Sequence, residues 1–218
     1  MARFSLIIFD MDGVLADSSP CHARAYQDLW KEIRVEGPRY ESIMGRPTGE
    51  VIREVTRAIQ PTPEQLERWI RFKQERARTY LQKETVTFPD TREVLEKLKA
   101  AGTSIAVGTS ASRDTAELLL NQIGIMKLIP VLVASDDVRE GKPAPDTYLE
   151  AMRRSAGSPD QTLVVEDSLS GLKAATAAGT WSAAVRANVV YSGPRFLGNF
   201  ADLRSLAGQL EDLDQCGE

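Results

Sequence analysis

Residues 9–18 read Phe9-Asp10-Met11-Asp12-Gly13-Val14-Leu15-Ala16-Asp17-Ser18. The apolar, β-branched and aromatic run 4–9 predicts a buried strand, so Asp10 and Asp12 stand at its carboxyl end. Gly13 follows, where the chain can turn tightly. Two carboxylates this close repel each other unless a cation lies between them. The stretch is therefore either a site for a metal ion or lysine, or a strand end with two solvated aspartates.

The composition is that of an ordinary globular protein, with 218 residues, 42% hydrophobic and 27% charged residues, and a net charge of −4. This length predicts one domain, or one domain with a small insertion. The negative charge argues against nucleic-acid and membrane-surface partners, because both require a basic face. An anionic substrate would need locally concentrated positive charge.

Cysteine usage and the start of the chain predict a cytoplasmic protein. Cys21 and Cys216 do not have the spacing of a zinc site and are expected to be free thiols. The first apolar run is too short for a signal peptide, and no stretch is long enough to span a bilayer. We therefore expect a reducing compartment.

Two patterns divide the chain. Residues 17–86 carry helical signals only, with helices expected at 20–34, 50–59 and 63–83. The third of these should begin with a capping box at Thr62-Pro63-Glu64-Gln65. The expected organisation is an α/β core of residues 1–16 and 87–218 with a helical domain inserted at 17–86.

The core segments alternate apolar strands with amphipathic helices. Beyond the first strand, the expected elements are strands at 104–108, 131–134, 163–165 and 182–185, and helices at 91–101, 114–123, 146–154, 170–178 and 202–213. The alternation predicts a Rossmann-like parallel sheet covered by helices on both faces. Ligands of such sheets bind at the carboxyl ends of the strands.

Polar residues gather at that predicted edge. They are Asp10, Asp12, Thr109, Ser110, Lys142, Glu166 and Asp167, and Ala111 stands beside Ser110 with a backbone N–H. Asp10, Glu166 and Asp167 offer hard oxygen ligands that suit Mg²⁺. Ser110 and backbone N–H groups beside it can bind phosphate oxygens, and Lys142 can neutralise negative charge. The candidate nucleophile is the Asp10 carboxylate.

The set resembles the haloacid dehalogenase superfamily of phosphotransferases over nearly the whole chain. Its four motifs are matched in order by 10–15, Ser110, 141–148 with Lys142, and 166–168 followed by Gly171. The resemblance implies that Asp10 attacks phosphorus and forms an aspartyl-phosphate. It also implies that Asp12 protonates the leaving alcohol and then activates water. In such proteins the Mg²⁺ ligands correspond to Asp10, the backbone carbonyl of Asp12, Glu166 and Asp167.

The helical insertion resembles the cap of the β-phosphoglucomutase and phosphoglycolate phosphatase branch. Such a cap closes over the site and excludes water, with hinges expected at 17–18 and near 87–88. By this resemblance His22 assists proton chemistry and Tyr26 meets the sugar. The plainer interpretation of a lone histidine is a partly exposed helix residue.

One feature of the mutases is missing. They carry an arginine a few residues after the cap-loop glycine, and no arginine follows Gly49 at that offset. Arg46 is a candidate substitute for binding the phosphate that does not react. Lys73 and Arg76 are similar candidates, or charges on a solvated helix face. This departure argues against mutase activity.

The expected function is a Mg²⁺-dependent phosphatase for small phosphorylated metabolites, sugar phosphates in particular, that is a monomer or weak homodimer. The closest alternative is a β-phosphoglucomutase. Dehalogenases need no metal and lack the second aspartate, whereas Asp12 is present here. A non-catalytic phosphate-binding module is the alternative from another class.

Overall fold

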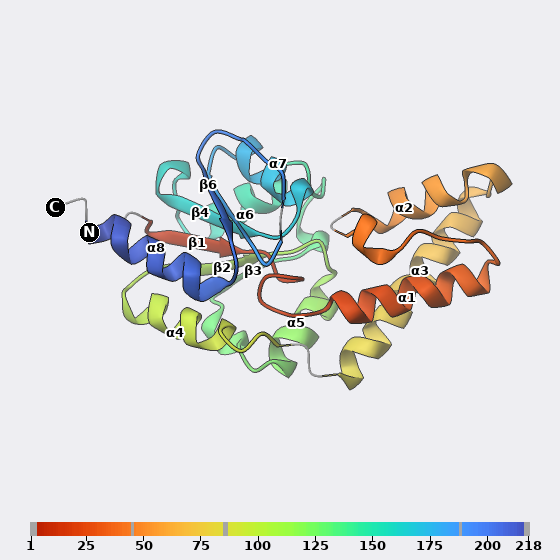
Figure 1. Cartoon of the computed structure of the whole chain (residues 1–218), viewed down its shortest axis with the longest axis horizontal. Helices are drawn as coiled ribbons and strands as arrows, with labels where there is room; N and C mark the ends of the chain where they lie inside the picture. Colours follow the sequence, from red (N-terminus) through yellow and green to blue (C-terminus); the bar gives the residue numbers. More distant parts are fainter. Residues whose placement is uncertain (1–3, 45, 85–86, 188, 216–218) are drawn as a thin grey trace. The chain divides into compact units, whose positions relative to one another are not determined.

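The computed structural model describes residues 4–44, 46–84, 87–187 and 189–215, so Gly45 and Cys216 lie outside the described residues. The chain forms two compact units (Figure 1). Unit 1 comprises Met1–Asp17 and Thr87–Glu218, and unit 2 comprises Ser18–Val86. The first boundary follows residue 17, one residue later than the sequence predicts. The second follows residue 86, where the sequence predicts it.

Unit 1 is built around a six-stranded sheet in the order β3-β2-β1-β4-β5-β6. Every pair of neighbouring strands is parallel. The strands are β1 (Leu6–Phe9), β2 (Ser104–Gly108), β3 (Val131–Val133), β4 (Thr162–Glu166), β5 (Trp181–Val185) and β6 (Phe196–Phe200). This confirms the predicted Rossmann-like α/β fold, with β1 at the centre of the sheet.

Strand β6 is not among the strands that the sequence predicts. Its Gly198 has φ 125° and Asn199 follows, a pair that is typical of a turn rather than a strand. The register with β5 shifts between Ser182 and Ala184, which marks a bulge. The strand lies at an edge of the sheet and only partly buries its side chains, so it lacks the continuous apolar run of a buried parallel strand.

Helices of unit 1 cover both faces of the sheet. Figure 1 shows α6 and α7 on one side of it and α4 and α8 on the other. The helices are α4 (Thr91–Ala100), α5 (Arg113–Gln122), α6 (Asp146–Arg154), α7 (Leu169–Ala177) and α8 (Leu203–Gln215), with short 3₁₀ turns at Met126–Leu128, Ser135–Asp137 and Pro159–Gln161. Leu6 and Ile8 of β1 pack with Tyr148 of α6 and Ala174 of α7. Since side chains alternate along a strand, Ile7 and Phe9 are buried on the opposite face.

Unit 2 is helical, as the sequence predicts. It contains α1 (Ser19–Glu32), α2 (Thr48–Val55) and α3 (Pro63–Lys83), with 3₁₀ turns at Tyr40–Ser42 and Arg57–Ile59. The expected capping box is present: Gln65 N donates to Thr62 Oγ1 at 3.3 Å, and Thr62 N donates to Gln65 Oε1 at 2.8 Å. Its core contains Tyr26, Trp30 and Trp69, and the first two rings stack 5.4 Å apart.

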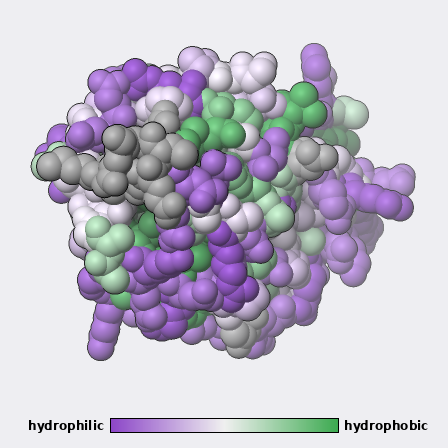
Figure 2. Space-filling model, turned by 60° about the vertical axis from the view of Figure 1, so that its left-hand side comes forward, coloured by the Kyte–Doolittle hydropathy of each residue, from purple (hydrophilic) through white to green (hydrophobic). Residues whose placement is uncertain are grey.

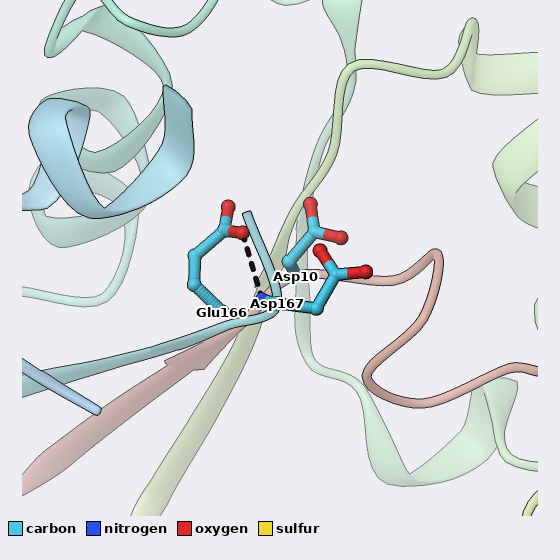
Figure 3. Close-up of side chains that lie close together, drawn as sticks. All are labelled: Asp10, Glu166 and Asp167. Carbon is cyan, nitrogen blue, oxygen red and sulfur yellow. Dashed lines mark hydrogen bonds between the residues drawn. The ribbon is translucent and has the colours of Figure 1, made fainter. Parts of the chain in front are cut away.

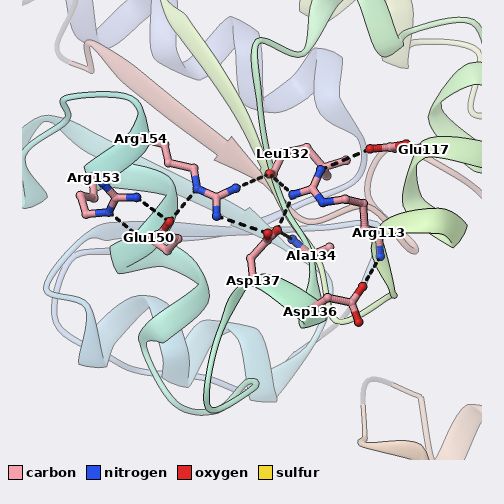
Figure 4. A network of polar contacts seen from close by, with 9 residues as sticks. All are labelled: Arg113, Glu117, Leu132, Ala134, Asp136, Asp137, Glu150, Arg153 and Arg154. Carbon is pink, nitrogen blue, oxygen red and sulfur yellow. Dashed lines mark hydrogen bonds and ion pairs between the residues drawn. The ribbon is translucent and has the colours of Figure 1, made fainter.

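Side chains cover the open edge of β3 (Figure 4). The outward carbonyl of Leu132 accepts hydrogen bonds from Arg113 at 3.2 Å and Arg154 at 3.1 Å. The next outward N–H, of Ala134, donates to Asp137 at 2.8 Å, and Asp137 also pairs with both arginines. An open strand edge invites pairing with another chain, so these contacts protect the sheet from edge-to-edge association.

We expect Asp137→Ala to lower the free energy of unfolding by about 2 kcal/mol, because it leaves the Ala134 N–H and two arginines without their shared acceptor. The matched control is Glu117→Ala, which removes only an exposed pair with Arg113 and should change stability by no more than about 0.5 kcal/mol. Urea unfolding measures both. Equal effects of the two variants would contradict a special role for Asp137.

The face in Figure 2 is mainly hydrophilic, with hydrophobic residues in small groups. Exposed large hydrophobic side chains of the described residues are Met44, Ile59, Leu149, Leu169 and Val190. Of the helices in the described ranges, none combines the length and the apolar character that crossing a membrane would require.

Candidate active site

The central strands place two acidic residues side by side at the carboxyl edge of the sheet. Asp10 directly follows β1, and its N–H donates to Val165 O of β4 at 2.9 Å. Asp167 directly follows β4. Since β1 and β4 are parallel neighbours, their ends bring these carboxylates together. Asp10 is 7% exposed and Asp167 is 9% exposed, so both are largely removed from water.

A tight turn follows Asp10. Gly13 N donates to Ala16 O at 2.8 Å, and Ala16 N donates to Met11 O at 3.0 Å. Gly13 has φ 79°, and a Cβ at this position would overlap the Asp167 carboxylate. Glycine is therefore required here for conformation and for space. Asp12 lies in this turn, two residues after Asp10, and its side chain is half-buried.

Lys142 lies at the centre of the buried charges. Its Nζ donates to Asp10 Oδ1, to Glu166 Oε1 at 2.7 Å and to Gly108 O at 2.9 Å. These three acceptors use the three N–H groups of an ammonium. Lys142 is 7% exposed, so its ammonium is hydrogen-bonded by the protein rather than by water. The predicted convergence of Asp10, Lys142 and Glu166 is thus present in the geometry.

Glu166 uses both of its oxygens within the protein. Its Oε1 accepts from Lys142 and from the Tyr148 hydroxyl at 2.6 Å. Its Oε2 accepts from Asp167 N at 3.0 Å and from Ser168 N at 3.1 Å and Oγ at 2.9 Å. A Cβ at Gly171 would overlap this carboxylate. Glu166 therefore holds Lys142 in place. Because both of its oxygens already accept hydrogen bonds, few lone pairs remain for a metal ion.

Burial and charge shift the proton affinities of the site in different directions. Burial raises the pKa of Asp10 to about 8, and the Lys142 charge offsets this only in part. Burial, followed by the charges of Glu166 and Asp10, raises the pKa of Asp167 well above its usual value. Burial alone would lower the pKa of Lys142, but Asp10 and Glu166 raise it well above its ordinary range.

Glu166 behaves differently from the two aspartates. Burial would raise its pKa, but the Lys142 charge and the hydrogen bonds from Lys142, Tyr148 and Ser168 hold the pKa below its ordinary value. Glu166 and Lys142 therefore form an ion pair, whereas burial favours the protonated forms of Asp10 and Asp167. A cation bound between these two carboxylates would favour their ionised forms.

The donor set fits a divalent metal ion. Carboxylate oxygens of Asp10, Glu166 and Asp167 lie within 4.8 Å of one another (Figure 3). Three hard oxygen donors suit Mg²⁺ rather than a thiolate- or imidazole-bound metal. Because Glu166 is satisfied within the protein, Asp10 and Asp167 are the better ligands.

Metal binding should reverse the pH dependence of stability. Between about pH 5.5 and pH 8, native Asp10, with a pKa of about 8 against 3.8 unfolded, retains a proton that the unfolded chain has released. Stability of the metal-free protein should therefore fall as pH rises through this window, and Asp167 acts in the same direction. A divalent metal ion such as Mg²⁺ would bind the ionised carboxylates, so its stabilising effect should grow with pH. Thermal unfolding in EDTA and in Mg²⁺ at several pH values tests this, and a metal-free stability that rises from pH 5.5 to pH 8 would contradict it.

The residues after β2 form a polar loop at the same edge. Thr109 is 1% exposed, and its Oγ1 accepts from Ala111 N at 3.0 Å. The backbone of Ala111 is held from the other side, where its carbonyl accepts from Ser135 N at 2.9 Å. The Ser110 side chain is exposed and follows the buried Thr109. These two hydrogen bonds hold the backbone of the loop at Ala111, and the exposed serine is accessible to a ligand.

The remaining predicted residues lie in unit 2. His22 Nδ1 is 2.9 Å from Lys73 Nζ, and this ammonium lies 4.6 Å from the centre of the Tyr26 ring. Lys73 is 5% exposed, so the description of a solvated helix face is wrong for it. Arg46 pairs with Glu50 at 2.7 Å and Glu54 at 2.5 Å, so binding a phosphate would require it to leave two carboxylates.

Arg76 also has internal partners. Its Nε donates to Asp28 at 2.7 Å, and the Tyr80 hydroxyl donates to the same carboxylate at 2.5 Å. These contacts tie α3 to α1, which favours a structural role over substrate binding.

One residue without an assigned role in the sequence analysis is Tyr148. It is fully buried in α6, donates to Glu166, and its ring centre lies 4.9 Å from Lys142 Nζ. Its position at the end of the Gly-Lys-Pro motif was a signal that it belongs to the site. The pattern gave no indication that its hydroxyl, rather than its ring alone, would be used.

Comparisons with known proteins identify the family of this chain. Residues 7–185 match the haloacid dehalogenase-like hydrolase family. A phosphorylated carbohydrates phosphatase of Thermotoga maritima is 33% identical over 180 residues, covering 79% of this chain and 81% of that protein. Fructose-1-phosphate phosphatase YqaB of Escherichia coli is 32% identical over 194 residues, covering 84% and 97%.

Solved structures show the same relationship. CbbY from Rhodobacter sphaeroides in complex with phosphate is 26% identical, with a TM-score of 0.78, and the match covers 93% of this chain and 96% of that one. A beta-phosphoglucomutase-like structure from Thermotoga maritima is also 26% identical, with a TM-score of 0.72, covering 96% and 100%. The predicted resemblance is confirmed. The chain belongs to the haloacid dehalogenase-like hydrolase family, in its β-phosphoglucomutase-like branch.

Proposed function

We propose that this protein is a Mg²⁺-dependent phosphatase that hydrolyses small phosphorylated carbohydrates through an aspartyl-phosphate on Asp10. The observation that carries the proposal is the buried Asp10 carboxylate, paired with Lys142 and next to Asp167. The names of two relatives, a phosphorylated carbohydrates phosphatase and a fructose-1-phosphate phosphatase, support the substrate class.

The reaction has two steps. In the first, a carboxylate oxygen of Asp10 attacks phosphorus, the bond from phosphorus to the substrate oxygen breaks, and Asp12 gives its proton to the leaving alcohol. In the second, Asp12 takes a proton from water, which attacks the same phosphorus. The bond from Asp10 to phosphorus then breaks, which releases inorganic phosphate and restores the Asp10 carboxylate.

Other residues of the site handle charge. Asp10, Asp167 and the backbone carbonyl of Asp12 would hold Mg²⁺, which supplies positive charge against the phosphoryl oxygens when bound. Lys142 neutralises Asp10, so the carboxylate can approach an anionic phosphate without prohibitive repulsion. Ser110 and backbone N–H groups of the loop after β2 would bind the phosphoryl oxygens.

Unit 2 is proposed to act as a cap, with hinges at 17–18 and near 87–88, beside the two chain crossings. Its closure would exclude water from the reaction. His22 and Tyr26 are the proposed contacts for the carbohydrate. The bond of His22 to the buried Lys73 supports this, because it places a cation and a titratable ring together.

A mutase is the second candidate, supported by the similarity to the beta-phosphoglucomutase-like structure and by the presence of His22 and Tyr26. The arginine that the mutases carry a few residues after the cap-loop glycine has no counterpart at that offset from Gly49. Arg46 is already paired with two glutamates.

A panel of phosphorylated metabolites separates the two candidates. The protein is assayed with Mg²⁺, with and without a sugar bisphosphate, and phosphate release and isomer formation are measured separately. We expect phosphate release from sugar monophosphates without any bisphosphate. Isomer formation that depends on the bisphosphate would favour the mutase, and no reaction with any phosphoester would favour a binding module.

A further inference from the structure

Two consecutive carbonyls of the turn after Asp10 are held by side chains from distant parts of unit 1. Val14 O accepts from Arg186 Nε at 3.3 Å, across 172 positions of the sequence. Leu15 O accepts from Thr91 Oγ1 at 2.9 Å, across 76 positions. Val14, Leu15 and Thr91 are fully buried, so these bonds do not compete with water.

Arg186 is arranged for this contact. It directly follows β5, at the carboxyl edge of the sheet, and has φ 58°, a conformation uncommon for a residue other than glycine. Its guanidinium lies 3.8 Å from the centre of the Phe88 ring and is 2.5 Å from Asp90 Oδ1. Only 13% of the Arg186 side chain is exposed, so the stack and the ion pair fix its direction.

Asp90 holds the other end of the ion pair. It stands at the N-cap of α4, yet its side chain makes no capping bond to that helix. Its Oδ2 instead accepts from Leu203 N at the start of α8 at 2.9 Å. Asp90 is 2% exposed. An N-cap aspartate normally accepts a hydrogen bond from its own helix. Asp90 instead binds two residues that are distant in the sequence, so its side chain connects the start of α4 to Arg186 and to the start of α8.

Hydrogen bonds within the turn connect these carbonyls to the backbone around Asp12. Leu15 N and Ala16 N both donate to Met11 O at 3.0 Å, and Gly13 N donates to Ala16 O. The backbone between residues 11 and 16 is therefore closed by its own hydrogen bonds. A displacement of Val14 or Leu15 must move Asp12, which lies within the same closed turn.

The chain leaves unit 1 after Asp17 and returns at Thr87, so both crossings are directly continuous with residues of this set. Near the first crossing the backbone carbonyls of Val14 and Leu15 are tied to the core, and near the second crossing the side chain of Asp90 is tied to the start of α8. Without such ties, any strain on the linkers would reach the turn that carries Asp12.

We propose that Arg186, Asp90 and Thr91 are positioning residues for Asp12, and that they hold the turn 11–16 where Asp12 can protonate the leaving group. The inference rests on the proposed phosphatase function. It assigns these side chains no contact with substrate. Their effect should therefore be largest in the step that uses the Asp12 proton.

Leaving-group dependence isolates that step. The kcat/KM of a phosphatase reports the steps up to the first irreversible one, which is transfer of the phosphoryl group to Asp10. A sugar phosphate releases a poor leaving group that needs a proton, whereas p-nitrophenyl phosphate releases p-nitrophenolate, which leaves without one. A misplaced Asp12 should reduce kcat/KM for the sugar phosphate far more than for the aryl phosphate.

Thr91→Val is the first variant, because it keeps the shape of the side chain and removes only the donor to Leu15 O. We expect kcat/KM to fall about 10-fold for the best sugar phosphate of the panel and less than about 2-fold for p-nitrophenyl phosphate. Thr91→Ser keeps the hydroxyl and should restore most of the loss. Circular dichroism and thermal unfolding verify that each variant is folded.

Arg186→Gln is the second variant, and its expected selective loss is larger, about 30-fold, because the bond to Val14 O and the ion pair are both lost. Arg186→Lys keeps the charge opposite Asp90 and should be less impaired. The matched control is Arg204→Gln, which removes an exposed ion pair with Glu93 and should leave both substrates unaffected.

The outcomes are distinct. Equal losses for both substrates, or wild-type kcat/KM in a folded Thr91→Val protein, would overturn the positioning role while leaving the phosphatase function intact. Asp12→Ala should show the same selective loss as the positioning variants, only larger. A wild-type protein that hydrolyses neither substrate would instead overturn the proposed function, and with it the role of this set.

Discussion

Replacement of Asp10 by asparagine should abolish phosphate release and leave the metal-free protein no less stable than the wild type. Asparagine has nearly the same shape but cannot form the aspartyl-phosphate, which is an acyl phosphate, so kcat should fall by at least about 10⁴-fold. Burial raises the pKa of Asp10 to about 8 from 3.8, which means that the fold disfavours its ionised form. A neutral side chain therefore suits this position when no metal is bound.

Two measurements test both halves of this expectation. Initial rates of phosphate release with Mg²⁺ measure activity, and thermal unfolding in EDTA measures stability. The control is Asp136→Asn, the same chemical change at an exposed aspartate that accepts a hydrogen bond from Arg113 N; its activity should equal that of the wild type. If Asp10→Asn retained more than about 1% of wild-type activity, the nucleophile would have to be another group.

Most of the fold follows from apolar patterning. Strands buried on both faces appear in the sequence as continuous apolar runs, so β2 has the bounds that its run predicts. Strand β1 begins two residues later than expected and ends where expected, and β4 extends one residue further at each end. The exception is β6, where Gly198 and a half-buried edge position remove that signal. Its pairing with β5 is a tertiary effect, which a local pattern does not contain.

The site was predictable as a set of positions but not as a set of contacts. Glu166 and Asp167 are adjacent and equally acidic, so the sequence offers them as equivalent metal ligands. In the structure, side chains alternate at the end of β4, and Glu166 turns toward Tyr148 and Lys142 while Asp167 faces Asp10. The two carboxylates therefore differ in partners and in the direction of their pKa shifts.

The contacts of Asp90 and Arg186 show a second limit. Each residue, considered alone, has an ordinary local explanation, as a helix cap and as a charge after a strand. Their ion pair joins residues 96 positions apart and depends on how α4, β5 and α8 pack. Only the assembled core reveals that both serve the turn next to the nucleophile.

Substitution of Lys142 by methionine should have the second large effect, on stability as well as on activity. The variant removes the three hydrogen bonds that Lys142 donates to Asp10, Glu166 and Gly108 O. The carboxyl groups of Asp10 and Glu166 then face each other in a buried site without the ammonium between them. Loss of one partner from a buried ion pair typically destabilises a protein by about 3–5 kcal/mol. Activity should fall by about 10²–10³-fold, because Lys142 no longer offsets the charge of the nucleophile and phosphate.

The double variant Lys142→Met/Glu166→Gln tests whether uncompensated charge is the cause. Glutamine removes one of the two carboxylates, so the double variant should regain part of the stability that Lys142→Met loses, whereas activity should stay low. The control is Lys97→Met, at an exposed lysine paired with Glu211, which should change the free energy of unfolding by no more than about 0.5 kcal/mol. Urea unfolding of the four proteins completes the comparison. A double variant less stable than Lys142→Met would mean that Glu166 stabilises the fold mainly through Tyr148 and Ser168, and that its charge is balanced without the lysine.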